Sequence, residues 1–250
     1  MRVLKVIAEG ITTSFRYPHF MQNIHPTFET PPPATIYGHI ASALGEWFDP
    51  RGVQFAYHFT FATKVRDKEH IIVLAPSTGK LKDTSIPKVL EGSINPFDRE
   101  LLFRPRLTLY INQPDWEPYF RRPKYAVVLG RSQDLFTYSH VGLVELQQAQ
   151  SAYFEHTILP YRASRRTHRG YAVLLPRFVD YRRNRHPIFE RYFIVRDRID
   201  SKDFLWFGEK PAEQYWVDPE TPEINGSHRG VEWISFVEQD YETSSMARLD

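Results

Sequence analysis

The strongest alternation of apolar and polar side chains lies between residues 53 and 61. A period of two predicts a β-strand with one aromatic face. RNA-recognition modules stack bases on such sheet aromatics, but their glycine- and aromatic-rich signature is absent from this sequence. We therefore expect this face to lie in the core. Its positions are Val53, Phe55, Tyr57, Phe59 and Phe61.

Weaker patterns of the same kind predict the remaining strands. The segment 10–33 has no periodicity, and a loop of that length in a compact domain is usually functional. Arg66–Glu69 is expected to be the turn that joins strand 53–61 to a paired strand at 70–75, and proline and glycine then break the pattern over 76–100, which indicates a protruding insertion. The further strands are expected at 2–9, 107–111, 125–129, 141–146, 171–175, 188–196 and 231–237.

Three consecutive prolines precede the main predicted helix, at 34–48. They must end any strand, because proline fixes φ and has no N–H donor. Pro33 suits the first helical position, and Thr30 or Thr35 is expected to accept from the first free amides. A second, short helical turn is expected near 114–121. The residues at helical spacing that should face the core are Ile36, Ile40, Leu44 and Trp47.

Gly38, Ser42 and Gly45 fall on another face of the same helix. Each glycine costs about 0.8–1 kcal/mol relative to alanine in a helix interior, so something must approach this backbone closely. Tight packing on a sheet is one explanation, and an RNA or protein partner is the other.

The element order up to residue 146 is strand, helix, strand, strand, short helix, strand. This order predicts an α+β, ferredoxin-like βαββαβ domain over 1–146, with a thumb-like insertion at about 76–104. Residues 147–240 are expected to form a β-rich, arginine-rich part, and 241–250 a loose tail. Because many unrelated proteins share this architecture, it does not by itself indicate a function.

The amino-acid composition excludes several kinds of chemistry and of membrane attachment. The chain of 250 residues has no cysteine, which excludes disulfides and thiolate catalysis. No apolar run approaches the ~20 residues that span a bilayer, and the N-terminus lacks a signal-peptide pattern. We expect a soluble cytoplasmic protein without membrane contact.

The net charge is only +2, but the segment 162–198 contains eleven arginines and no lysine. Arginine favours bidentate contact with phosphate and stacking on bases. Aromatic residues interleave with these arginines, which favours a nucleic-acid surface over a solvated face with scattered ion pairs.

Known catalytic signatures are absent. The ten histidines include no close ligand pair for a metal, and no nucleotide-binding loop or serine-hydrolase motif is present. Metal-free RNA cleavage requires a base near a 2′-hydroxyl and a cation for the developing charge. The first candidate for such a base is His168, which has Arg165, Arg166 and Arg169 beside it in the sequence. The second is His39, on the predicted helix. For both we favour an ordinary phosphate-binding or structural role, with no cofactor.

Several motifs together resemble the CRISPR-associated Cas-five family of the RAMP superfamily. They are Ser14–Pro18, Thr30–Gly38, Ala43–Gly45 and Val128–Leu135, the last similar to that family's Leu-Gly-Arg-Ser motif. Their order and spacing make the combination specific over residues 1–146. The overall pattern is most similar to the type I-B form, in which a separate Cas-six nuclease cuts the precursor.

The resemblance implies a non-catalytic subunit of a type I Cascade complex that binds the 5′ handle of the CRISPR RNA. It also implies contacts with the Cas-seven backbone subunit and a Cas-eight-type large subunit, and indirect contact with target DNA. The thumb would carry Lys80, Lys82 and Lys88. The residues expected to contact RNA are Arg16, Tyr17, Thr30, Pro32, Thr35, Tyr37, Gly38, Gly130, Arg131, Ser132, Arg165, Arg166, His168 and Arg169.

Two physical arguments accompany these positions. A helix N-terminus behind a stiff turn presents amides to phosphate, and glycine lets RNA lie against the backbone.

One branch of the family, type I-C, cleaves its own precursor with Tyr, Lys and His. Its tyrosine would fall near Leu44, where this chain has none. A metal-independent endoribonuclease remains the alternative function.

Overall fold

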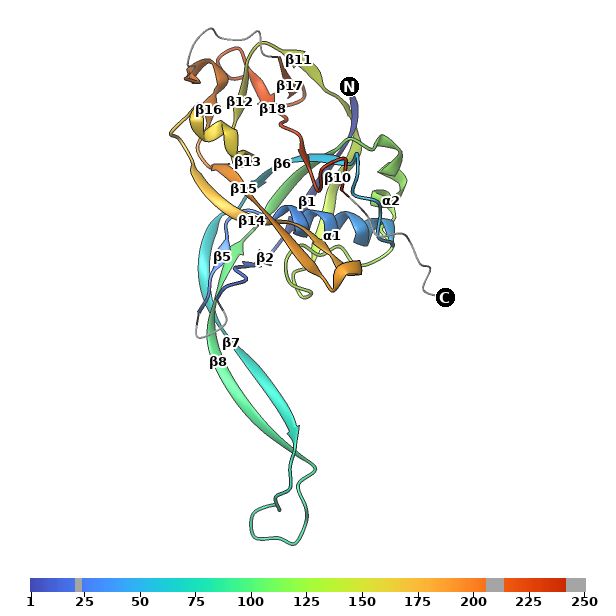
Figure 1. The fold of residues 1–250 in the computed structure, drawn as a ribbon, viewed down its shortest axis with the longest axis vertical. Helices are drawn as coiled ribbons and strands as arrows, with labels where there is room; N and C mark the ends of the chain where they lie inside the picture. Colours follow the sequence, from blue (N-terminus) through green and yellow to red (C-terminus); the bar gives the residue numbers. More distant parts are fainter. Residues whose placement is uncertain (21–23, 206–213, 242–250) are drawn as a thin grey trace.

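The computed structural model describes residues 1–20, 24–205 and 214–241. The fold is a mixed α+β structure rich in strands (Figure 1). The expected loose tail, beyond its first residue, lies outside the described residues. No helix in the described part of the chain is long and apolar enough to cross a bilayer.

The central sheet has the strand order β10-β1-β9-β6-β19, and each neighbouring pair is antiparallel. β6 matches the predicted strand 53–61, and Phe55, Tyr57 and Phe59 on its aromatic face are buried, so the predicted core face is confirmed. The strands are β1 (Arg2–Gly10), β6 (Gln54–Thr60), β9 (Arg106–Ile111), β10 (Phe136–Glu145) and β19 (Ile234–Ser235).

Helix α1 (Pro33–Leu44) packs on this sheet and begins at Pro33, as predicted. The predicted threonine cap is wrong: Pro32 is the N-cap residue and no side chain caps the helix. The hydroxyl of Thr30 instead lies 2.8 Å from the Tyr57 hydroxyl. The helix ends early because Gly45 adopts a left-handed conformation with φ 86°.

That early end changes the predicted core face of α1. Ile36 and Ile40 are fully buried, as expected, but Trp47 lies beyond the helix and is 48% exposed. A second short helical region follows β9, as predicted near 114–121. It consists of the 3₁₀ helix η1 (Pro114–Trp116) and helix α2 (Glu117–Arg121).

A long β-hairpin projects from the body of the molecule (Figure 1). Its strands, β7 (Thr63–Pro76) and β8 (Leu90–Phe103), pair over their whole length. The expected turn at Arg66–Glu69 and the pairing of 70–75 with strand 53–61 are therefore wrong, and the insertion begins at Thr63. The aliphatic run 71–74 looks like a core strand in the sequence, but its side chains are exposed here.

Segment 10–33 is organised by short strands at the base of this hairpin. Two of them pair with β8 and two pair with each other, which provides partners for their backbone groups. They are β2 (Thr12–Thr13), β3 (Phe15–Arg16), β4 (Ile24–His25) and β5 (Thr27–Phe28).

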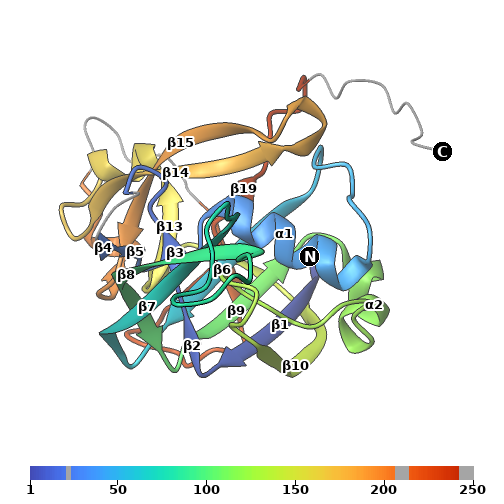
Figure 2. The ribbon, with the colours of Figure 1, turned by 90° about the horizontal axis from the view of Figure 1, so that it is seen from below.

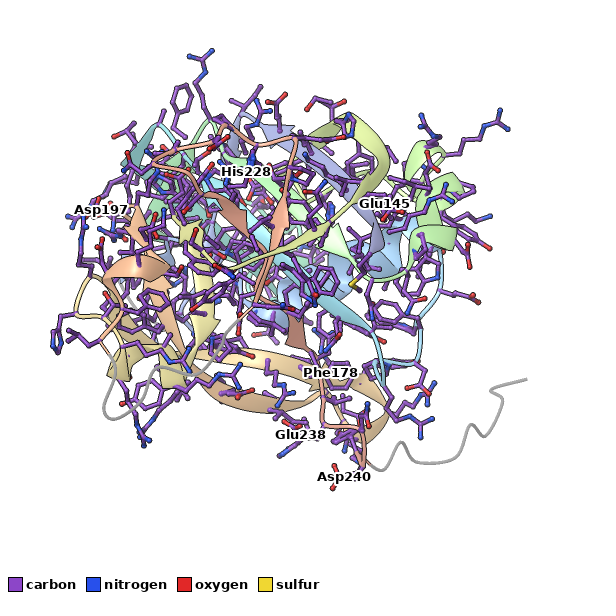
Figure 3. All side chains as sticks on the ribbon, turned by 90° about the horizontal axis from the view of Figure 1, so that it is seen from above. Glu145, Phe178, Asp197, His228, Glu238 and Asp240 are labelled. Atoms are coloured by element: carbon purple, nitrogen blue, oxygen red, sulfur yellow. The ribbon has the colours of Figure 1, made fainter. Side chains whose placement is uncertain are left out.

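The C-terminal third covers both faces of the central layer. β13, β15 and β14 form a sheet, and β14 packs over α1, so that the helix lies between two sheets (Figure 2). Near the end of the described chain, the segment containing Glu238 packs against β14. Glu238 Oε1 accepts from Arg177 Nη1 at 2.6 Å and lies beside Phe178 in Figure 3. The strands are β13 (Thr157–Pro160), β14 (Tyr171–Asp180) and β15 (His186–Val195).

A second small sheet, of order β11-β17-β18-β12-β16, covers the opposite face. There Val3 and Tyr110 of the central sheet pack with Val231 of the C-terminal part. Asp218 is fully buried and accepts from Lys5 Nζ at 2.6 Å, which ties this sheet to β1. The elements are β11 (Gln147–Ala149), β12 (Ala152–Phe154), β16 (Ile199–Asp200), β17 (Tyr215–Asp218) and β18 (His228–Gly230), with the 3₁₀ helices η2 (Tyr161–Arg165), η3 (Tyr181–Arg183) and η4 (Ser201–Asp203).

Two further strand predictions need correction. Residues 125–129 form no strand, and only Val128 makes an isolated bridge, to Leu135. Of the strand predicted at 231–237, only Ile234–Ser235 is extended and paired. That strand joins the central sheet, and residues from both predicted parts share the largest hydrophobic cluster.

Candidate nucleic-acid interface

A groove lies where the loop before α1, the base of the β7–β8 hairpin and the β14–β15 hairpin meet. Its volume of about 390 Å³ lies within the roughly 300–1,000 Å³ range of small-molecule sites. We call it the tyrosine groove. The lining residues that carry its chemistry are Tyr17, Phe20, Glu29, Lys64, Glu100, Tyr171 and Arg196.

Aromatic rings form two of its walls. Tyr17 stacks on Phe28 with ring centroids 3.7 Å apart, and Phe20 meets Tyr17 edge-on at 6.0 Å. From the other side, Tyr171 contributes a ring beneath the Arg196 guanidinium, 5.3 Å from the ring centroid. Burial raises the pKa of Tyr17 and raises the pKa of Tyr171 to about 12, with a further contribution from Tyr17. Both phenols are therefore neutral near pH 7.

The floor of the tyrosine groove contains paired charges. Lys64 Nζ lies 3.0 Å from a Glu29 carboxylate oxygen and 3.5 Å from a Glu100 oxygen. Arg196 forms an ion pair with the other oxygen of Glu29, and Arg66 Nε lies 3.8 Å from the other oxygen of Glu100. Each carboxylate thus already faces two cations.

The groove brings together two regions that the sequence analysis selected separately. Tyr17 lines it, and the adjacent Arg16 is exposed on β3. The predicted arginine cluster lies on η2 and on the loop that leads directly into Tyr171. In that cluster Arg165, His168 and Arg169 are exposed and Arg166 is half-buried.

Of the seven lining residues named above, the sequence analysis selected only Tyr17 and missed the other six. Phe20, Glu29 and Glu100 belong to no pattern that it used. Tyr171 and Arg196 belong to the interleaved aromatic and arginine pattern of the last third, so that pattern was a usable signal. Lys64 had no signal, because it lies between the predicted strand 53–61 and the predicted turn at Arg66–Glu69.

The Thr30–Gly38 region does not form an open RNA surface in this structure. Thr30, Pro32 and Tyr37 are buried, and the Tyr37 hydroxyl donates to the Phe48 carbonyl at 2.6 Å. Thr35 is half-buried, and its amide donates to Pro32 O at 2.8 Å. The Ile36 amide also donates to Pro32 O, at 3.2 Å, so these first helical amides already have a partner within the turn. These side chains hold the turn in place.

The two helix glycines differ in their surroundings. At Gly38 a Cβ atom would meet nothing within 4 Å, so packing inside the chain does not require glycine there. At Gly45 the φ of +86° and a Cβ position 2.5 Å from Lys124 both require glycine. Tight packing explains Gly45, whereas no contact within the described chain explains Gly38.

The Gly130–Ser132 loop packs against the start of the chain. Gly130 has φ +99°, and a Cβ there would lie 2.4 Å from Thr13 Oγ1. Arg131 donates to both oxygens of the buried Asp134, from Nε at 2.9 Å and from Nη2 at 2.7 Å. Ser132 is exposed beside this network.

Arg131 also reaches the hairpin, where its Nη1 pairs with Glu69. Glu69 in turn accepts from Arg99 Nε at 2.6 Å. The Arg131 guanidinium is thus committed to two carboxylates, and its side chain is only 16% exposed. In this structure Arg131 braces the base of the hairpin, and its predicted contact with RNA stays a prediction.

The two candidate catalytic histidines lie in different environments. His39 is buried, which lowers its pKa. Its Nδ1 is 2.8 Å from Val128 O and its Nε2 is 3.1 Å from the Tyr138 hydroxyl. Nδ1 therefore donates to the carbonyl and Nε2 accepts, as in a structural histidine. His168 is exposed. Within the described ranges, no group of three or more His, Asp or Glu could hold a metal ion.

The outer half of the hairpin is apolar on one face, and on the other face Ile71 and Val73 are paired with Asn95 and Ser93. Ile72 and Ile94 are directly opposite each other and are 63% and 65% exposed. Ile71 and Val73, on the other face, are 43% and 53% exposed. The predicted thumb lysines lie at the tip, where Lys80 and Lys82 are exposed and Lys88 is half-buried.

These features define a strand-rich α+β protein with a projecting hairpin and an aromatic groove at its base. No protein-family model and no curated protein sequence matches the chain.

Solved structures do match. One, described as a CRISPR RNA-guided surveillance complex, has a TM-score of 0.50 and 14% identity, covering 79% of this chain and 89% of that chain. A CRISPR protein from Archaeoglobus fulgidus gives a TM-score of 0.41 at 11% identity, covering 79% of this chain and 87% of that one. A Cas protein gives 0.35 at 12%, covering 78% and 96%. At this level of identity the first likeness establishes a shared fold.

Proposed function

We propose that this chain is a non-catalytic, RNA-binding subunit of a type I CRISPR Cascade complex, of the Cas-five kind within the RAMP superfamily. The observation that carries the proposal is the fold shared, over 79% of the chain, with a chain of a CRISPR RNA-guided surveillance complex. The sheet order β10-β1-β9-β6, with a helix after β1 and another after β9, supports a ferredoxin-like RAMP domain. The quoted sequence motifs support the Cas-five and type I-B assignment.

In this proposal the 5′ handle of the CRISPR RNA lies along the tyrosine groove and its arginine-rich rim. Single-stranded RNA is bound by aromatic platforms flanked by cations. Tyr17 and Tyr171 supply the platforms. Arg16, Arg165 and Arg169 are exposed cations close to them in the sequence.

The hairpin is proposed to dock on the neighbouring Cas-seven backbone subunit. Neighbouring apolar side chains exposed on one face are typical of an interaction site, and the lysines at its tip suit contact with the guide RNA. A Cas-eight-type large subunit would complete the complex and contact target DNA.

One gel tests the proposal against the endoribonuclease alternative. Purified protein is incubated with labelled CRISPR repeat RNA, either in EDTA or in Mg²⁺. We expect tight binding of the repeat 5′ handle, no cleavage in either buffer, and weaker binding of a scrambled RNA of equal length. Cleavage that survives EDTA and is lost in His168→Ala would instead establish the nuclease. Equal binding of repeat and scrambled RNA would contradict the handle-binding role.

A further inference from the structure

The side chains that line the tyrosine groove determine whether a base or a phosphate of a nucleic acid can enter it. Its walls are neutral aromatic rings, and its floor contains Glu29 and Glu100, whose side chains are only 16% and 14% exposed. A phosphate placed there would lie against these two carboxylates, and the nearby cations Lys64, Arg66 and Arg196 already pair with them. An uncharged base can fill the groove without repulsion from the carboxylates.

Hydrogen bonding narrows the choice of base. Glu29 and Glu100 together offer about eight acceptor sites. Lys64 reaches one oxygen of each, Arg196 pairs with the other oxygen of Glu29, and the Thr27 amide donates to Glu100 Oε2 at 3.3 Å. The other oxygen of Glu100 lies 3.8 Å from the nearest arginine nitrogen, that of Arg66, which is too long for a hydrogen bond. The floor thus has acceptor capacity to spare and suits a ligand that brings N–H donors.

We infer that the tyrosine groove binds one unpaired nucleobase with an exocyclic amino group, such as cytosine or adenine, and discriminates against uracil. Cytosine presents an N4 amino group, for which Glu is a suitable acceptor. Uracil has a carbonyl oxygen at that position, which would face the carboxylates. This inference rests on the proposed RNA-binding function and adds to it a specificity for the base.

The phosphates on either side of that base have separate partners. Arg16 precedes Tyr17 in the chain, and Arg169 lies two residues before Tyr171. Both arginines are exposed. The backbone of the RNA can therefore follow the arginines at the rim while one base turns inward between the tyrosines.

The test compares two oligonucleotides that differ only in the relevant group, rC10 and rU10. Their affinities for the full chain are measured by fluorescence anisotropy at fixed salt, alongside labelled repeat RNA. We expect rC10 to bind at least fivefold more tightly than rU10. Tyr171→Ala should weaken rC10 binding by roughly 5- to 150-fold, the loss of one stacked base. Glu100→Gln, which keeps the shape but removes the charge, should reduce the preference for cytosine.

Tyr125→Ala is the matched control, because Tyr125 is 58% exposed and does not line the tyrosine groove. Thermal unfolding verifies that each variant is folded. Equal binding of rC10 and rU10, or a Tyr171→Ala variant that behaves like Tyr125→Ala, overturns the inference even if repeat RNA binds tightly. Selective, Tyr171-dependent rC10 binding without any preference for repeat RNA supports the inference and overturns the Cascade function instead.

Discussion

Replacing Arg131 with alanine tests whether its side chain stabilises the base of the hairpin or contacts the RNA. The substitution removes two hydrogen bonds to Asp134, whose side chain is fully buried, and the ion pair to Glu69. Breaking a buried ion pair costs about 3–5 kcal/mol. Asp134 keeps the Thr12 hydroxyl at 3.3 Å and the backbone amide of residue 131 at 3.1 Å, and Glu69 keeps Arg99. We therefore expect a loss of about 2–3 kcal/mol.

For a chain of this size, each kcal/mol lowers Tm by about 2–4 °C, so Arg131→Ala should unfold about 4–12 °C lower. If Arg131 touches no phosphate, the salt dependence of repeat-RNA binding between 50 and 200 mM will keep its slope. The control is Arg169→Ala, at an exposed position. It should leave Tm unchanged and reduce the slope by about 0.7, the value for one phosphate contact on a single strand. An Arg131→Ala variant with an unchanged Tm and a slope reduced by about 0.7 would refute the bracing role.

Three further predictions concern pH, the glycines and the hairpin. Burial, with Arg229 and His156 nearby, lowers the pKa of His58 to about 3. Below about pH 6.5 the unfolded chain gains a proton there that the folded chain does not. Its free energy of unfolding should therefore fall by about 2 kcal/mol from pH 7.5 to pH 5 in urea titrations, and this loss should disappear in a folded His58→Gln variant. Gly38→Ala should raise the free energy of unfolding by up to about 1 kcal/mol but weaken repeat-RNA or subunit binding, whereas Gly130→Ala should destabilise. Unchanged binding by Gly38→Ala would remove a partner from that face. Ile72→Asp should change stability by no more than about 0.5 kcal/mol yet reduce assembly with the backbone subunit in size-exclusion chromatography, and full assembly would argue against docking there.

The parts of the fold that were predictable are those whose pattern reports burial directly. β6 was predicted because its alternating aromatic residues pack into the core, and α1 because Ile36 and Ile40 recur at helical spacing. The hairpin misled the same reasoning. Its aliphatic run at 71–74 has the composition of a core strand, but it lies outside the body of the molecule. Hydrophobic patterning cannot distinguish a side chain buried in its own chain from one kept for a partner.

The candidate site was likewise predictable only in part from the sequence. Arg16 and Tyr17 were selected from a local motif, and the arginines at 165–169 from composition. Neither signal contained the long-range packing that brings β14 beside the first loop. Arg131 illustrates a second limit of sequence motifs. A motif shows that an arginine matters, but only the positions of Asp134 and Glu69 show that its guanidinium is already occupied.

The base and the outer half of the hairpin differ in what stabilises them. An isolated two-stranded hairpin is only marginally stable in water, and its outer half has neither a third strand nor a helix against it among the described residues. The base is held by β2 and β4 and by the chain of ion pairs through Glu69 and Arg131, which fixes the direction of projection. A partner that covers Ile72 and Ile94 would bury apolar surface worth about 25 cal/mol per Å². In the proposed complex, docking would therefore stabilise the outer half of a hairpin whose direction is already set by its braced base.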